Sequence, residues 1–375
     1  MTDDRNLAAL GDSGADDSPS LWLTLLLTAA AGGMGWGIRG QYGHETGAMI
    51  AGVLVALVIG LLFCGRQSSL FTARMVALTA VGISFGGSMT YGQTVGLTHD
   101  AELHGNWAAL RWGMLGLFTI GAIWIGFAGV LMGAALGRKR YRPLELLLLF
   151  IFLIQLYFLG VWLFNEPFNP ANRELPQIYF SDSWYWEPDK AELKPRPEVW
   201  GGLALALAAL WLYVSVWKRD AMARNVGLFA IIFGGIGFTT GQSVQAFHAW
   251  NAAWFKEGWF APIEPFMNWW NTMETVFGAI LGMGLGLGVW LNRTKLPPRF
   301  EDEVEIAPAA EFVLLAGHVA ALAAWNFMSF GALDRVADHA LTMGLVPLAL
   351  IVGGRYSPYL IALPIVAMPI CGKTL

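Results

Sequence analysis

Charged residues are scarce in this chain of 375 residues. Asp, Glu, Lys and Arg make up 13% of it, half of the roughly 25% that soluble domains carry. Hydrophobic residues make up 56%, and they recur in runs of about 20 residues that predict a polytopic membrane protein. Because these runs do not alternate as barrel strands do, we expect an all-α fold. The net charge of −4 gives no reason to expect a nucleic-acid partner.

The chain has only two cysteines, Cys64 and Cys371, whose spacing supports neither a disulfide framework nor a cysteine metal site. A phosphate-binding loop is also lacking, because the terminal CGKTL has no glycine loop before its Gly-Lys-Thr. Any transport would therefore be passive or ion-coupled, with Glu45, Glu274 or the histidines as candidate proton carriers. The absence of an HExxH pair, a serine elbow and a cysteine nucleophile favours a protein that is not an enzyme. We predict no metal and no cofactor.

The N-terminal residues 1–19 are acidic and lack the basic region of a secretory signal. They predict a disordered cytoplasmic tail ahead of a single transmembrane domain over residues 20–375. Hydropathy predicts about ten or eleven spans in that domain. These spans lie near residues 20–38, 47–64, 71–93, 110–136, 144–164, 199–217, 226–246, 272–291, 312–331, 340–354 and 357–371.

Lys and Arg gather in every second connection between the predicted spans. The clearest case is GRKRYRP at 137–143, and the connections after the second, sixth, eighth and tenth spans are basic as well. The positive-inside rule then places these connections and the N-terminus in the cytoplasm of a bacterial inner membrane. The other connections face outward. The longest, 165–198, is rich in proline and aromatic residues, so we expect an ordered extracytoplasmic cap at the membrane interface.

A glycine-rich segment recurs along the chain. Residues 85–99 read FGGSMTYGQTVGLTH, and residues 233–248 read FGGIGFTTGQSVQAFH. Both place a histidine six residues after the glutamine of a Gly-Gln pair, and an Asn-Trp pair follows each of them, at 106–107 and 268–269. GGMGWGIRGQ at 32–41 is a looser third copy. We interpret the pattern as repeated helical hairpins with tips on the outer side, where glycines let helices approach closely or break.

The predicted topology brings polar side chains together at the outer ends of the spans. The candidate binding residues are Arg39, Gln41, His44, Glu45, Gln93, His99, Arg111, Gln242, His248, Asn268 and Glu274. Glutamine amides donate and accept hydrogen bonds without net charge, and the two arginines add positive potential. Our preferred hypothesis is a transporter or channel for a small polar or anionic solute that binds among the Gly-Gln hairpins.

Two other functions stay open. A membrane-embedded enzyme would act on a lipid-linked or small substrate at the outer leaflet, with His44 as the base and Glu45 as its orienting acid. HDAELH at 99–104 offers further acid–base groups. A cofactor-holding subunit of a membrane complex would instead use His99 and His248 as axial ligands of a haem or another tetrapyrrole. The expected partners are membrane lipid and a small solute, together with a second copy of the chain or a membrane partner subunit.

The glycine-rich hairpins that end in a short polar motif resemble the bacterial thiosulfate-permease family, whose repeats carry glycine-cysteine pairs. The resemblance covers about 15 residues in each copy and concerns architecture. Glutamine stands at the positions where that family has its functional cysteine, for example at Gln93 and Gln242. The resemblance therefore implies hairpins arranged around a transport site, but it does not carry thiol chemistry over to this chain.

Overall fold

The structure is a computed structural model, and it describes residues 19–39, 45–64, 69–89, 91–181, 195–297, 306–310, 312–313, 316–317, 320 and 324. This part of the chain is mostly helical and holds no β-strand. Seven of its helices are long and apolar enough to cross a membrane. The predicted all-α, polytopic membrane fold is confirmed.

The described helices follow the predicted order. They are α1 (Leu21–Arg39), α2 (Glu45–Ile59), α3 (Ser69–Gly86), α4 (Gly92–His99), α5 (Trp107–Leu136), α6 (Pro143–Phe164), α8 (Trp200–Leu212), α9 (Ala221–Trp250), α10 (Ala252–Glu257) and α11 (Trp269–Leu291). Short π-helical segments extend α2 to Cys64 and α8 to Trp217.

Eight predicted spans correspond to α1, α2, α3, α5, α6, α8, α9 and α11. The third span, predicted over residues 71–93, was wrong at its end. Helix α3 stops at Gly86, and a non-helical segment separates it from the short helix α4. The tail up to residue 18 and nearly all of the three spans predicted from residue 312 onward lie outside the described residues.

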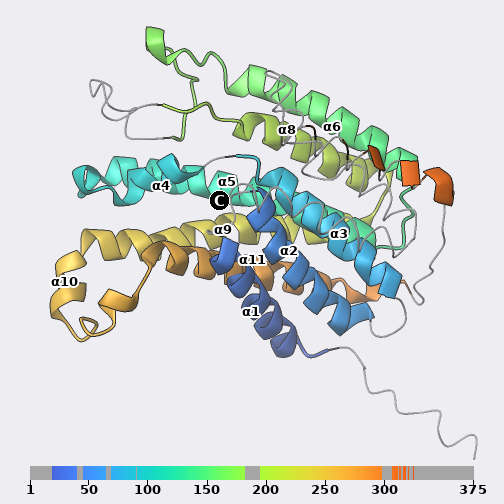
Figure 1. Cartoon of the computed structure of the whole chain (residues 1–375), viewed down its shortest axis with the longest axis horizontal. Coiled ribbons are helices and arrows are strands. Elements are labelled where there is room, and N and C mark those ends of the chain that lie inside the picture. Colours follow the sequence, from blue (N-terminus) through green and yellow to red (C-terminus); the bar gives the residue numbers. More distant parts are fainter. Residues whose placement is uncertain are drawn as a thin grey trace, which may run out of the picture.

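By their contacts, six helices form a closed ring in the order α1, α2, α3, α5, α9 and α11, and α11 packs back against α1. Figure 1 shows this bundle from the side. The ring consists of three hairpins, α1–α2, α3–α5 and α9–α11. In each hairpin the first helix carries, or leads into, one of the glycine-rich segments. The hairpin α6–α8, whose sequence has no Gly-Gln pair, lies outside the ring and packs on α5 through α8.

Facing glycines allow the closest helix crossings in the ring. At the crossing of α1 and α11, a Cβ atom built on Gly32 or on Gly278 would overlap the backbone carbonyl of the other. Gly121 and Gly234 face each other in the same way where α5 crosses α9. Membrane helices associate through such small residues because the backbones can then touch.

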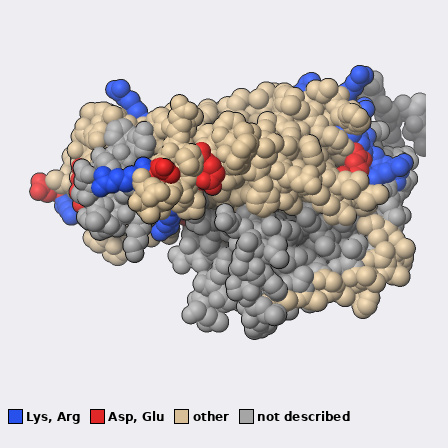
Figure 2. Space-filling model, turned by 90° about the horizontal axis from the view of Figure 1, so that it is seen from above, with Lys and Arg blue, Asp and Glu red and all other residues tan. Residues whose placement is uncertain are grey.

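The basic connections meet at one end of the molecule, which we name the basic end. The Arg138 guanidinium donates hydrogen bonds to the carbonyls of Thr294 and Leu296, and Lys218 Nζ donates one to the carbonyl of Arg140. The indole of Trp290 donates to the carbonyl of Pro19, so α1 also starts here. We name the opposite end, which carries α4 and α10, the distal end. On the face seen in Figure 2, most charged side chains of the described residues lie toward the two ends of the molecule.

The region predicted to form the outer cap is described at residues 165–181 and 195–198. The backbone N–H of Phe180 donates to Glu198 Oε1 at 2.8 Å, and Ser181 Oγ donates to the same oxygen at 2.6 Å. Trp112 of α5 donates its indole N–H to the carbonyl of Tyr179 at 2.8 Å, which ties this segment to the ring. Burial raises the pKa of Glu198 to about 7, although the hydrogen bonds to Ser181 and Phe180 act against that rise.

We expect the stability of the cap to fall as pH rises toward 7. An unfolded glutamate loses its proton near its ordinary pKa of 4.5, whereas folded Glu198 keeps its proton up to about pH 7. Folding therefore loses free energy between these values, on the order of 3 kcal/mol at most, and the full loss persists above pH 7. Melting temperatures of the purified protein between pH 5 and 8 test this. The variant Glu198→Gln should remove that part of the pH dependence, and an unchanged profile would contradict the prediction.

Candidate functional site

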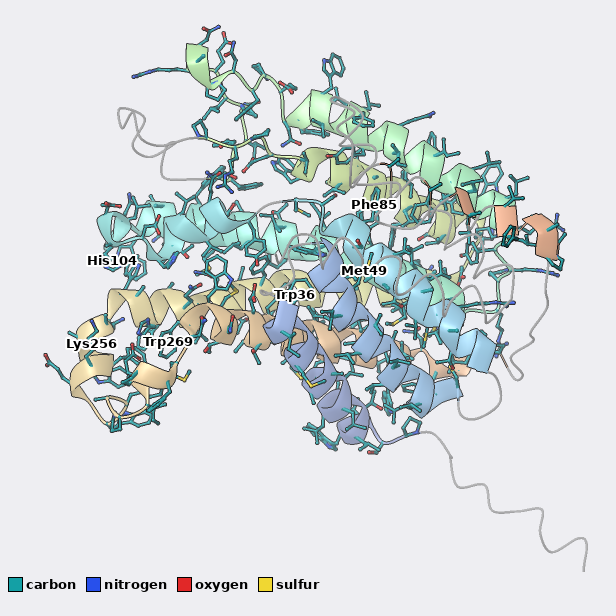
Figure 3. The ribbon with its side chains drawn as sticks, in the orientation of Figure 1. Trp36, Met49, Phe85, His104, Lys256 and Trp269 are labelled. Atoms are coloured by element: carbon teal, nitrogen blue, oxygen red, sulfur yellow. The ribbon has the colours of Figure 1, made fainter. Side chains whose placement is uncertain are left out.

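Aromatic rings fill the interior of the six-helix ring, and we call them the aromatic core. They are Trp36 of α1, Tyr91 before α4, Trp124 of α5, Phe238 of α9 and Phe277 of α11. Trp36 contacts Trp124 and Phe277 at centroid distances of 5.0 and 4.6 Å. Phe238 stacks on Phe277 at 4.6 Å and meets Tyr91 at 5.0 Å. Figure 3 shows Trp36 in the middle of the bundle, with His104, Lys256 and Trp269 toward the distal end.

A carboxylate is buried next to the aromatic core. Glu274 lies on α11, three residues nearer the distal end than Phe277, and its side chain is 0% exposed. The Tyr91 hydroxyl donates to Glu274 Oε1 at 2.8 Å, and the Trp270 indole donates to the same oxygen at 3.1 Å. Tyr91 reaches Glu274 from the break between α3 and α4. Ionisable groups inside membrane spans are costly and usually mark a pathway or a binding site.

A buried amide lies at the same level on the neighbouring helix. Gln242 follows Phe238 by one turn of α9, and its side chain is 0% exposed. Because Phe238 stacks on Phe277 and the two helices run in opposite directions, Gln242 and Glu274 lie at one depth of the ring. Gln245 follows on the same face of α9 and is 5% exposed. We call Tyr91, Thr98, Gln242, Gln245 and Glu274 the polar layer.

Hydrogen bonds fix the orientation of the Gln242 amide. Gln242 Nε2 lies 2.7 Å from Thr98 Oγ1, and the Thr98 hydroxyl donates its one proton to the carbonyl of Val95 at 2.7 Å. In this arrangement Thr98 Oγ1 accepts from Gln242, and the nitrogen of the amide faces it. The other amide atom, Gln242 Oε1, is buried and has no hydrogen-bond partner within the described residues. The same holds for Gln245 Oε1.

The structure brings Gln93 and Gln242, both predicted from the Gly-Gln pairs, onto adjacent helices. Gln93 is half-buried on α4, five residues before Thr98, which corresponds to an axial rise of about 8 Å. The two segments nevertheless have different backbones. In the first segment the helix is interrupted between α3 and α4, whereas α9 continues without interruption through the second segment. In the second segment, Gly241 lets α9 approach the carbonyl of Met273 on α11.

The other predicted residues that the structure describes lie around this layer or away from it. His99 ends α4, and its Nδ1 lies 3.0 Å from the carbonyl of Val95. Arg111 is exposed on α5. Asn268 caps α11, because its Oδ1 accepts from the N–H of Asn271 at 3.1 Å. Asn106 caps α5 in the same manner, so both Asn-Trp pairs start a returning helix.

For the third, looser copy of the glycine-rich segment, the structure describes only the helix ends on either side of residues 40–44. Arg39 is the last residue of α1 and Glu45 is the first of α2. Their side chains, together with Gln41 and His44 between them, lie outside the described part of the chain. The end of α1 adjoins α11, because a Cβ atom on Gly37 would contact Thr275 Oγ1. The backbone of Arg39 therefore ends α1 beside the part of α11 that carries Glu274.

His248 has its own partners at the distal tip. Its Nε2 lies 2.8 Å from Glu264 Oε1, and its ring stacks on Trp269 at 4.1 Å. Glu264 Oε2 also accepts from the Trp269 indole at 3.2 Å. In the described ranges no group of three His, Cys, Asp or Glu side chains is placed to hold a metal ion.

Four residues of this site were not predicted from the sequence: Tyr91, Thr98, Gln245 and Trp270. Each had a weak signal, because each lies within a few residues of a predicted one. Tyr91 precedes the Gly92-Gln93 pair, Thr98 precedes His99, and Trp270 lies one turn before Glu274. Their roles depend on how the helices rotate against one another, which a single sequence does not specify.

Comparisons of this chain with protein-family models, with curated proteins and with solved structures give no match. Its function must therefore be argued from the site itself.

Proposed function

We propose that the protein moves a small polar solute across a membrane, as a transporter or a channel, and that the solute binds at the polar layer. The observation that carries this proposal is the complete burial of Glu274 and Gln242 at one depth of a helical ring. Burying polar groups inside a membrane protein costs free energy. A binding role is the usual reason that such groups are kept.

The arrangement of the ring supports the proposal. Three hairpins surround one interior, and repeated hairpins around a shared site are typical of membrane transporters. The break between α3 and α4 supplies Tyr91 to the polar layer. Irregular backbone at membrane depth is tolerated where protein surrounds it or where it lines a cavity. The other rings of the aromatic core, those of Trp36, Trp124, Phe238 and Phe277, lie between the polar layer and the basic end, in the position of a barrier that the solute must pass.

A second candidate function rests on the pair of His248 and Glu264. A histidine held 2.8 Å from a carboxylate is the arrangement of a general base with its orienting acid. The pair lies at the distal tip, away from the polar layer. A membrane-embedded enzyme that acts at the membrane surface is therefore the alternative that a test of transport must also detect.

Flux measurements test the proposal. The protein is reconstituted into liposomes, and the uptake of a panel of radiolabelled anionic, neutral and cationic small solutes is compared with that of empty liposomes. We expect at least one solute to enter, and Gln242→Ala to lower its rate about tenfold or more because a buried hydrogen-bonding side chain is lost.

The matched control is Ser243→Ala, which changes the next residue of α9 at an exposed position. This variant should keep the wild-type rate. Equal uptake by protein-containing and empty liposomes would contradict the proposal, and so would a Gln242→Ala variant of normal rate. Conversion of a solute into a new compound, with loss of that conversion in His248→Ala, would support the enzyme instead.

A further inference from the structure

The polar layer carries buried oxygen atoms that lack donors. Gln242 Oε1 and Gln245 Oε1 have no hydrogen-bond partner within the described residues, and their side chains are 0% and 5% exposed. The two residues follow Phe238 by four and seven positions, so they lie on the face of α9 whose phenylalanine belongs to the aromatic core. A buried carbonyl oxygen without a donor is unfavourable, and a ligand that brings a donor relieves this.

Thr98 decides that Gln242 presents an oxygen rather than an N–H group. Its hydroxyl proton is used by the carbonyl of Val95, so its oxygen holds Gln242 Nε2 at 2.7 Å. If the amide turned over, the Thr98 hydroxyl would have to rotate toward Gln242 Oε1 and give up its hydrogen bond to the carbonyl of Val95, so the observed orientation keeps one hydrogen bond more. Thr98 itself is fixed, because the Trp250 indole donates to its backbone carbonyl at 2.9 Å. The orientation of the amide is thus set by α4, not by the solute.

From this geometry we infer that the solute presents N–H donors to α9, as an amide or an amine does, and that Thr98 is the residue that sets this preference. An anion offers only acceptors, and it would meet Gln242 Oε1, the oxygen that Thr98 orients, unfavourably. The sequence led us to expect a polar or anionic solute, and this geometry restricts the expectation to polar solutes that carry N–H donors. It rests on the proposed function for the presence of a solute in the ring, but binding can be measured without transport.

Acetamide and acetate make a matched pair of probes, because they have nearly the same shape and differ in an amide nitrogen against a charged oxygen. Binding of each to the purified protein in detergent is measured by saturation-transfer NMR. We expect acetamide to bind at least about tenfold more tightly than acetate, the effect of one well-placed hydrogen bond. Methylammonium, a cationic N–H donor, shows whether the preferred donor is neutral or charged, and binding of either donor supports the inference.

Two variants of Thr98 separate specificity from folding. Thr98→Val removes the acceptor for Gln242 Nε2, so the amide can turn over and the preference for acetamide over acetate should fall about tenfold. Thr98→Ser keeps the hydroxyl and should keep the preference. Because the readout is a ratio of two affinities, a general loss of folded protein does not imitate it.

Three outcomes would overturn the inference. The first is tighter binding of acetate than of acetamide and methylammonium. The second is an unchanged preference in Thr98→Val. The third is no saturable binding of any of the three probes, which would mean that the glutamine oxygens are satisfied by ordered water only. If the probes bind as expected but no solute crosses liposomes, the proposed function fails while this inference stands.

Discussion

Replacing Glu274 with glutamine should lower solute flux by about a hundredfold or more and leave the protein folded. Glutamine keeps an oxygen that accepts from the Tyr91 hydroxyl and the Trp270 indole, so both donors stay satisfied. The variant removes only the ionisable group that the ring buries. The large effect is expected because a carboxylate kept at membrane depth is functional far more often than structural. Flux in liposomes and the melting temperature in detergent are measured on the same preparation.

Glu274→Ala should behave differently, since it removes the oxygen to which the buried Tyr91 hydroxyl and the half-buried Trp270 indole donate. We expect a loss of stability of about 3–5 kcal/mol, typical of breaking a buried polar network. Glu145→Gln is the matched control, because it makes the same change in α6, outside the ring, where Lys218 contacts the carboxylate at 2.8 Å. That variant should keep its flux. If Glu274→Gln transported normally, the carboxylate would have no part in function.

The second large effect concerns the crossing of α1 and α11. Gly278→Ala should lower the free energy of unfolding by about 1–3 kcal/mol, because the added methyl group overlaps the carbonyl of Gly32 and forces the helices apart. Gly32→Ala should act in the same way from the other side. Once the helices have separated, the second methyl group finds room, so the double variant should be destabilised by much less than the sum of the two.

Unfolding in detergent, followed by tryptophan fluorescence, measures all three variants. Gly92→Ala is the control, because a Cβ atom there would have no neighbour within 4 Å. Strictly additive effects of Gly32→Ala and Gly278→Ala would show that the two glycines do not meet, which would contradict the crossing that closes the ring.

The sequence was enough to predict the eight spans that the structure describes, because hydropathy responds to burial in lipid regardless of how helices pack. It was not enough to predict where α3 ends. The Phe-Gly-Gly of residues 85–87 and that of residues 233–235 look alike, yet only the first lies at a helix end. There, Trp124 of α5 donates to the carbonyl of Ile83 at 2.7 Å, and Gly87 lies against its ring. A contact from a distant helix decides the conformation.

Part of the candidate site could likewise be predicted from the sequence, and part of it depends on how the helices pack. Gln242 and Glu274 were predicted because polar residues are conspicuous in apolar spans. Arg111 was selected by the same criterion, and it is exposed because its position on α5 turns away from the interior. A one-residue shift rotates a side chain by about 100° around a helix, so the residues that meet depend on packing. The fixed orientation of the Gln242 amide depends on Thr98, more than a hundred positions away.

The direction of protein synthesis determines which contact of the ring forms last. A chain is made from its N-terminus, so α1 enters the membrane long before α11, the helix that it contacts through Gly32. Until α11 is made, Gly32 of α1 faces lipid or a temporary partner, and the Tyr91 hydroxyl cannot yet donate to Glu274. Glu274 thus arrives when most of its surroundings already exist. The last helix of the ring therefore brings its carboxyl group into an environment that protein already lines.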